Sequence, residues 1–226
     1  MLKKLFGGKD APKKEVTARE AYALAREELI SKYPTEADGA YLCCLYTSVE
    51  EAGMEVRADG TCRGWHLDFF LPTSRTLCLV RVLKGKASVK ELPWEKTQKK
   101  PVEYIFAVYG IGAGEAALSE PGKIPEGWLD TPEIIAPIQK ALTEGTVPIA
   151  LVLPAEHLRY LQEEKAKDAL AFPPPPAQCY AAICSGEDAY EEDSHLFYIE
   201  AAGGRVVKEH TFRFPNLFFF GTSVNW

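Results

Sequence analysis

The sequence lacks any long apolar run, and this limits what the chain can be. No stretch approaches the ~18 consecutive apolar residues that a transmembrane helix needs. The N-terminal stretch MLKKLFGGKDAPKKE offers only Leu5 and Phe6 before glycines and further charge, whereas a secretory signal needs an apolar region of about 7–15 residues. We therefore expect a cytoplasmic protein with a flexible tail at residues 1–16 and no membrane span.

An excess of positive charge is also missing. The chain has 26 Lys and Arg residues against 32 Asp and Glu residues, which gives a formal net charge of -6. An acidic surface repels phosphate backbones, so we expect no nucleic acid partner. A small local basic patch remains compatible with this overall charge.

The cysteines and histidines lack the spacing of a metal site. Cys179 and Cys184 are separated by four residues and have no second Cys/His pair at ligand spacing. We expect the six cysteines to be buried, reduced thiols. Cys43 and Cys44 are adjacent in a strand-like run, so they are predicted to point to opposite faces.

Cofactor-binding loops are absent as well. The GIGAG motif at 110–114 follows a strand-like run, but Pro121 and Pro125 would break the helix that a dinucleotide loop requires. The acidic run EDAYEEDS at 187–194 lacks the alternating ligands and fixed glycine of a calcium loop. We therefore predict no cofactor.

What is present is a clear order of elements in the first half, at residues 17–96. Thr17 and Glu20 have the spacing of a capping box, and the helix that they begin is expected to end before Pro34. Its predicted apolar stripe includes Ile30. A strand follows from Gly39, and Asp59-Gly60 is a strong hairpin signal. Three alternating runs then predict strands at 62–71, 75–84 and 87–92.

The second half, at residues 129–226, repeats that order after a strand and connecting loop at 97–128. Asp130 or Thr131 is expected to cap a helix that Pro137 kinks or shortens. Further strands are predicted at 147–154, 179–185, 195–202 and 205–214, with a helix near 155–170. The predicted fold class is α+β, a helix packed on an antiparallel β-meander, with two such units in tandem.

Two segments carry a resemblance to a known family. TAREAYALAREEL, at 17–29, resembles the opening helix of PepSY-type domains, and LFYIEAAGGRVVKEH, at 196–210, resembles their closing hairpin. These domains are similar in plan to cystatin-like folds, so the resemblance implies a helix packed on an antiparallel sheet. It covers at most residues 17–94 and 129–214. The family is credited mainly with binding or inhibitory roles and is usually exported or membrane-tethered, so only the fold is carried over.

His66 and Asp68 are the best-placed polar pair for chemistry. In the strand at 62–71 they share one face, while Trp65, Leu67 and Phe69 share the other and are predicted to be core. An Asp can orient a His for base catalysis, but a nucleophile or metal must complete the unit. We interpret the pair as an ordinary surface pair on the more solvated face of a sheet.

The remaining residues suggest no site either. Neighbouring strands could bring Cys62 or Thr76 to His66, but no pattern indicates that they do. His157, His195 and His210 lack partners at ligand or catalytic spacing. We therefore predict no catalytic, cofactor-binding or metal-binding residues.

These observations favour a cytoplasmic interaction or ligand-binding protein without catalytic activity. Its partner would be an unknown protein or small ligand. One alternative is an enzyme of unrecognised type that uses His66 and Asp68. Another is a structural homo-oligomer, with a homodimer formed through the aromatic C-terminal segment FRFPNLFFFGTSVNW at 212–226.

Overall fold

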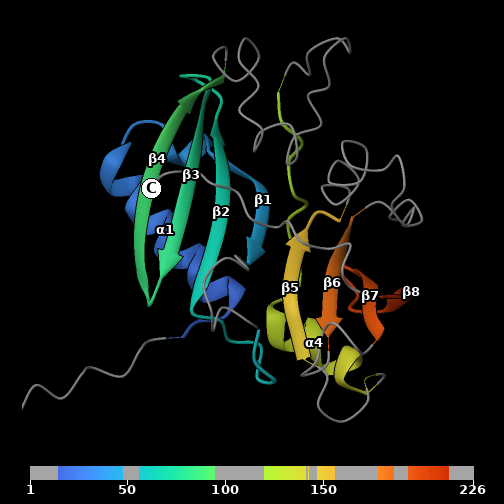
Figure 1. Ribbon diagram of the computed structural model, residues 1–226. Helices are drawn as coiled ribbons and strands as arrows, with labels where there is room; N and C mark the ends of the chain where they lie inside the picture. Colours follow the sequence, from blue (N-terminus) through green and yellow to red (C-terminus); the bar gives the residue numbers. More distant parts are fainter. Residues whose placement is uncertain are drawn as a thin grey trace, which may run out of the picture.

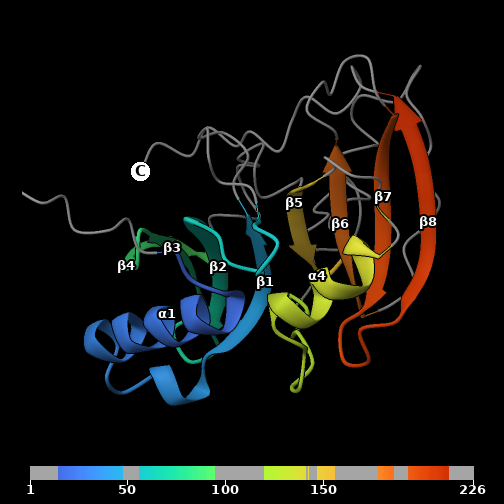
Figure 2. The same ribbon diagram turned by 90° about the horizontal axis from the view of Figure 1, so that it is seen from below.

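The computed structural model describes residues 15–47, 56–94, 120–140, 142, 147–155, 178–185 and 193–213. Within these residues eight strands form one continuous antiparallel sheet, and the two labelled α-helices lie on the same face of it (Figures 1 and 2). The predicted α+β class is confirmed. The elements are α1 (Ala18–Lys32), a short 3₁₀ helix η1 (Ala37–Gly39), β1 (Tyr41–Thr47), β2 (Gly64–Leu71), β3 (Thr76–Leu83), β4 (Lys86–Pro93), α4 (Thr131–Gln139), β5 (Val147–Leu153), β6 (Cys179–Ser185), β7 (Asp193–Glu200) and β8 (Val206–Arg213).

The sheet joins both halves of the chain. Its order is β4-β3-β2-β1-β5-β6-β7-β8, so β1 to β4 form one meander and β5 to β8 form another. The meanders meet where β1 pairs with β5, with Leu45 opposite Leu153 and Tyr46 opposite Val152. All the strands predicted within the described residues are present, and they share a single sheet.

Helix α1 has both a capped start and an apolar face that packs against the sheet. Thr17 and Glu20 make the predicted capping box, and the helix ends at Lys32, before Pro34. Its buried residues are mostly alanines, which let the helix approach β2, β3 and β4 closely. Ile30, which the predicted stripe included, is 48% exposed and lies outside the packed face.

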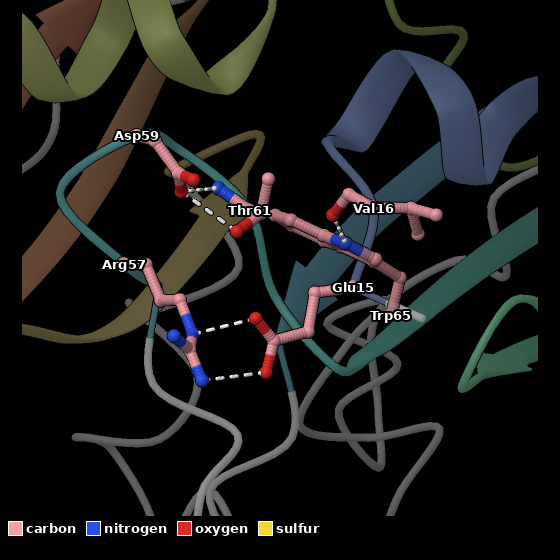
Figure 3. Close-up of polar contacts among 6 residues, drawn as sticks. All are labelled: Glu15, Val16, Arg57, Asp59, Thr61 and Trp65. Carbon is pink, nitrogen blue, oxygen red and sulfur yellow. Dashed lines mark hydrogen bonds and ion pairs between the residues drawn. The ribbon is translucent and has the colours of Figure 1, made fainter. Parts of the chain in front are cut away.

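The Asp59-Gly60 signal gives a turn but not a strand hairpin. The Asp59 carboxylate accepts hydrogen bonds from the Thr61 backbone N–H, at 3.0 Å, and from the Thr61 hydroxyl, at 2.7 Å (Figure 3). Cys62, just after this turn, forms an isolated antiparallel bridge with Val16. Val16 is only 1% exposed, so the end of the expected N-terminal tail is packed against the sheet.

Both faces of the sheet carry buried apolar side chains. The face under α1 and α4 holds the larger cluster, which includes Trp65, Leu67 and Phe69, the predicted core trio of β2. The opposite face holds a second cluster, which includes Phe70 and Trp94. The expectation that this second face would be solvated is wrong for the central strands, because every residue of β2 is buried.

Cys43 and Cys44 also differ from the prediction. The register of β1 shifts between Leu42 and Cys44, which marks a bulge, and both thiols join the cluster on the face opposite the helices. A bulge adds a residue and breaks the strict alternation of a strand. All six cysteines are free and buried, as predicted.

Several predictions fall outside the described residues. They concern the strand near 104–112, the GIGAG motif, the helix near 155–170 with His157, the acidic loop at 187–192 and the segment 214–226 proposed for a homodimer.

Candidate functional site

His66 lies in a row of side chains that crosses the first meander. Tyr46 of β1, His66 of β2 and Arg81 of β3 are register partners on the face opposite the helices. The imidazole of His66 stacks on the Tyr46 ring, with centroids 4.9 Å apart and planes 7° from parallel. Asp68 follows two residues later on the same face.

This pair is not on the surface, which corrects the sequence interpretation. His66 is 5% exposed and Asp68 is 1% exposed. The alternation of side chains along β2 shows that His66 and Asp68 share a face. It does not show whether other side chains cover that face, so it could not distinguish a solvated pair from a buried one.

Burial decides the protonation state of His66. Desolvation and, to a smaller extent, the nearby Arg81 cation together lower the pKa of His66 to about 3. The imidazole is therefore neutral near pH 7. A general base works best when its pKa is close to the working pH, so His66 is poorly matched to that role.

The groups that could have completed a catalytic unit are elsewhere. Cys62 belongs to the cluster on the helix-covered face, so its thiol points away from His66. Thr76 is the register partner of Leu71, at the far end of β2. Burial and, second, the charge of Asp68 raise the pKa of the Cys43 and Cys44 thiols, which keeps both protonated.

Of the other histidines, His195 and His210 lie in the second meander, and His157 lies outside the described residues. His195 of β7 contacts the Glu209 carboxylate of β8, with Nδ1 3.1 Å from Oε1. His210 lies on the next position of β8, opposite Leu196. Within the residues that the structure describes, no three His, Cys, Asp or Glu side chains gather closely enough to hold a metal ion.

A second polar network joins the two helices at their N-termini. The Ala18 N–H donates to the Thr131 hydroxyl at 3.1 Å, and the Arg19 N–H donates to the Asp130 carboxylate at 2.9 Å. The Glu20 N–H donates to Thr17, the N-cap of α1, at 3.3 Å. Three donors that a helix start leaves without partners are thus satisfied, two of them by the start of the other helix. We call this arrangement the helix junction.

The Asp59–Thr61 turn is hydrogen-bonded to the helix junction. The Thr131 hydroxyl donates to the Gly60 carbonyl at 2.6 Å, and Thr131 is fully buried. Gly60 has φ +79°, and a Cβ atom there would lie 2.4 Å from the Pro132 nitrogen. Only glycine, which has no Cβ atom, allows both the positive φ at this position and the close approach of Pro132.

Arg19 extends the helix junction to the loop before α4. Its guanidinium lies 3.8 Å from the Trp128 ring centroid and donates to the Trp128 carbonyl. The sequence predicted the Thr17 capping box and a cap at Asp130 or Thr131, but not the contact between the two helix starts, because Arg19 and Asp130 are 111 positions apart. The network is structural, because it satisfies the backbone donors at the start of α1.

A small cleft of about 230 Å³ lies between the loop before α4 and the β7–β8 turn. Glu126 and Glu200 are its acidic lining residues. Glu126 pairs with Lys123 at 3.0 Å, and Glu200 pairs with Arg205. Because each carboxylate already has a cation, the cleft presents no unbalanced charge to a ligand.

The comparisons with known proteins add little. No family model matches the chain, and no curated protein matches it. A solved structure from Clostridium difficile 630, described as a "putative lipoprotein (CD1622)", aligns with a TM-score of 0.43 at 8% identity, covering 84% of this chain and 91% of that one. A likeness this weak supports no argument about fold or function.

None of the helices in the described part of the chain has the length and apolarity to cross a membrane.

Proposed function

We propose that this chain is a non-catalytic interaction or ligand-binding protein. The observation that supports this is the burial of its best candidates for chemistry. His66 is 5% exposed with a pKa lowered to about 3, and the six thiols are all buried. Acid–base and nucleophilic catalysis both need a group that meets the substrate in a reactive protonation state.

We also propose that the protein consists of two helix-plus-meander units of PepSY-like or cystatin-like plan. In support, α1 precedes the meander of β1 to β4, and α4 precedes the meander of β5 to β8. The first strands of the two meanders pair with one another. A cytoplasmic location is part of the proposal, and six free thiols favour a reducing compartment.

A selection from a random-peptide library on the immobilised full chain tests the function. Sheet edges recognise extended peptides through backbone hydrogen bonds, so a peptide is a suitable first ligand class. We expect saturable binding of a selected peptide, unchanged in mass after long incubation. The variant His66→Phe should bind equally well.

Two results would contradict the proposal. One is chemical conversion of the bound peptide. The other is that no selected peptide binds saturably to the folded chain.

A further inference from the structure

Cys43 and Cys44 share one face of the sheet, although adjacent residues of a regular strand point to opposite faces. The cause is the bulge in β1, where the register shifts between Leu42 and Cys44. Asp68 is the register partner of Cys44. After burial and the charge of Asp68, the charge of Cys43 is the third cause that raises the pKa of the Cys44 thiol, so the two sulfur atoms lie close enough to interact. The bulge therefore brings together two thiols that a regular strand would separate.

The other thiols are not placed to pair with either member. Cys62, Cys78 and Cys184 belong to the cluster on the helix-covered face. Cys179 shares the face of the pair but lies on β6, and β5 separates β6 from β1. Neighbouring strands are about 4.8 Å apart, so this separation is roughly 10 Å, whereas a disulfide spans at most about 7 Å between Cα atoms. Oxidation of the folded chain would therefore join the two thiols of β1.

The thiol pair lies beside the β1–β5 pairing, which we call the seam. The seam pairs Leu45 with Leu153 and Tyr46 with Val152. Among the described residues, no strand pairs with the β5 side of the two cysteines. Burial keeps both thiols protonated while the strand is closed, since each residue is only 1% exposed. A segment with a strand partner on one side alone opens locally at a lower cost, and this opening admits a small reagent.

We propose that Cys43 and Cys44 form a reversible redox switch, in which a low-molecular-weight disulfide oxidises the two thiols to a disulfide within β1. One thiolate attacks the oxidant and releases one of its two thiols. The second thiolate then attacks the mixed disulfide and releases the other thiol. One S–S bond forms as another breaks, and the two cysteine protons end on the released thiols. This inference does not depend on the proposed function.

Closing the disulfide is expected to change the seam. Bridged cysteines have Cβ atoms about 3.5–4.5 Å apart, and adjacent residues of an extended backbone do not reach this spacing, so the backbone between Cys43 and Cys44 must bend. The next residue, Leu45, pairs with Leu153 of β5. Strain also makes a disulfide easier to reduce, which is typical of regulatory disulfides. We therefore expect oxidation to loosen the seam and reduction to restore it.

Oxidation of the folded full chain tests the inference. The chain is equilibrated in mixtures of reduced and oxidised glutathione, the remaining thiols are alkylated, and the peptide that contains both cysteines is analysed by mass spectrometry. This peptide should lose two hydrogen atoms and escape alkylation, and dithiothreitol should reverse the change. Hydrogen exchange at the four residues of the seam should become roughly tenfold faster on oxidation, while exchange in the β7–β8 hairpin stays unchanged.

Two serine variants locate the disulfide. Cys43→Ser removes one partner, so Cys44 should remain a thiol or form a mixed disulfide with glutathione, and exchange at the seam should keep its reduced rate. Cys179→Ser changes a buried thiol on the same face and is the matched control. It should form the disulfide at the same glutathione ratio as the wild type. Peptide mapping of the wild type identifies the bridged pair even where a variant fails to fold.

Three results would overturn the inference. The first is a disulfide that includes Cys179 in place of one member of the pair. The second is a pair that stays reduced at every glutathione ratio until urea unfolds the chain. The third is a disulfide between Cys43 and Cys44 that leaves hydrogen exchange at the seam unchanged, because the bond would then act as no switch.

Discussion

The two polar networks of this protein lie on opposite faces of the same sheet. On the helix-covered face, Thr131 and Gly60 of the helix junction satisfy each other and the start of α1 through hydrogen bonds between uncharged groups. On the opposite face, His66 and Asp68 are titratable groups enclosed in the sheet. The buried contacts of the helix junction join uncharged groups and its Asp130 carboxylate is half-buried, whereas both titratable groups of the second network are buried.

The comparison shows that burial alone does not indicate function. Buried uncharged groups stabilise a fold by satisfying backbone donors. A buried imidazole has a further effect, because burial disfavours its charged form and links stability to pH. The helix junction is expected to respond to steric changes and the His66 row to acid.

The largest effect is expected from Gly60→Ala in the helix junction. The new Cβ would lie 2.4 Å from the Pro132 nitrogen, and φ is +79°. Steric overlap and backbone strain should together lower the free energy of unfolding by roughly 3–5 kcal/mol. Chemical denaturation measures the change. Gly122→Ala, where a Cβ meets no atom within 4 Å, is the matched control; similar losses in the two variants would contradict the proposed fit.

Acid should destabilise the protein through His66. Its folded pKa, about 3, lies below the ordinary histidine value of 6.5, so between these values the unfolded chain binds more protons. The stability that depends on neutral His66 is therefore fully present above pH 6.5. It falls as the pH drops, by up to about 1.4 kcal/mol per pH unit. His66→Phe keeps an aromatic ring against Tyr46 and removes the proton site.

Urea unfolding between pH 7 and pH 4 measures this dependence. The wild type should lose more stability than His66→Phe over that range, by a few kcal/mol at most. Equal slopes for the wild type and His66→Phe would show that other groups carry the acid sensitivity.

The next effect is expected from Thr131→Val. Valine has a similar shape but offers no hydroxyl to the Gly60 carbonyl or to the Ala18 N–H. Two buried backbone groups would lose their partner, at a cost of about 2–3 kcal/mol. Thr211→Val, on the exposed part of β8, should change stability by less than ~0.5 kcal/mol.

Hydrogen exchange distinguishes the helix junction from simple local damage. Thr131 lies in α4, yet its substitution should speed exchange of the Ala18 and Arg19 amides in α1. Exchange that rises only in α4 would contradict the view that the second helix caps the first.

Short-range signals in the sequence predicted most of the fold. The capping box at Thr17 and the alternation in β2 depend on neighbouring residues, so the sequence displays them directly. The pairing of Leu45 with Leu153 depends on residues more than a hundred positions apart, so the joined sheet could not be predicted. The burial of His66 also required knowledge of what lies over the second face.

The helix junction shows the same limit. Thr17 could be identified as a cap from its local motif with Glu20, and the cap of α4 could be narrowed to Asp130 or Thr131, of which the structure uses Asp130. That Asp130 also accepts a hydrogen bond from the Arg19 N–H of α1 follows only from the packing of the two helices. The steric need for Gly60 follows from the same contact, whereas the sequence showed only a turn.

The smallest effect is expected for the ion pair between Glu15 and Arg57, next to the Asp59–Thr61 turn. Arg57 binds the Glu15 carboxylate through two nitrogens, at 2.6 and 2.7 Å (Figure 3). The Arg57 side chain is 62% exposed, so water and salt screen the pair. A double-mutant cycle with Glu15→Gln and Arg57→Met should give a coupling of about 0.2–1 kcal/mol that falls with added salt. A coupling above ~2 kcal/mol would make this ion pair, rather than the hydrogen bonds of the helix junction, the main connection between residues 15–17 and the Asp59–Thr61 turn.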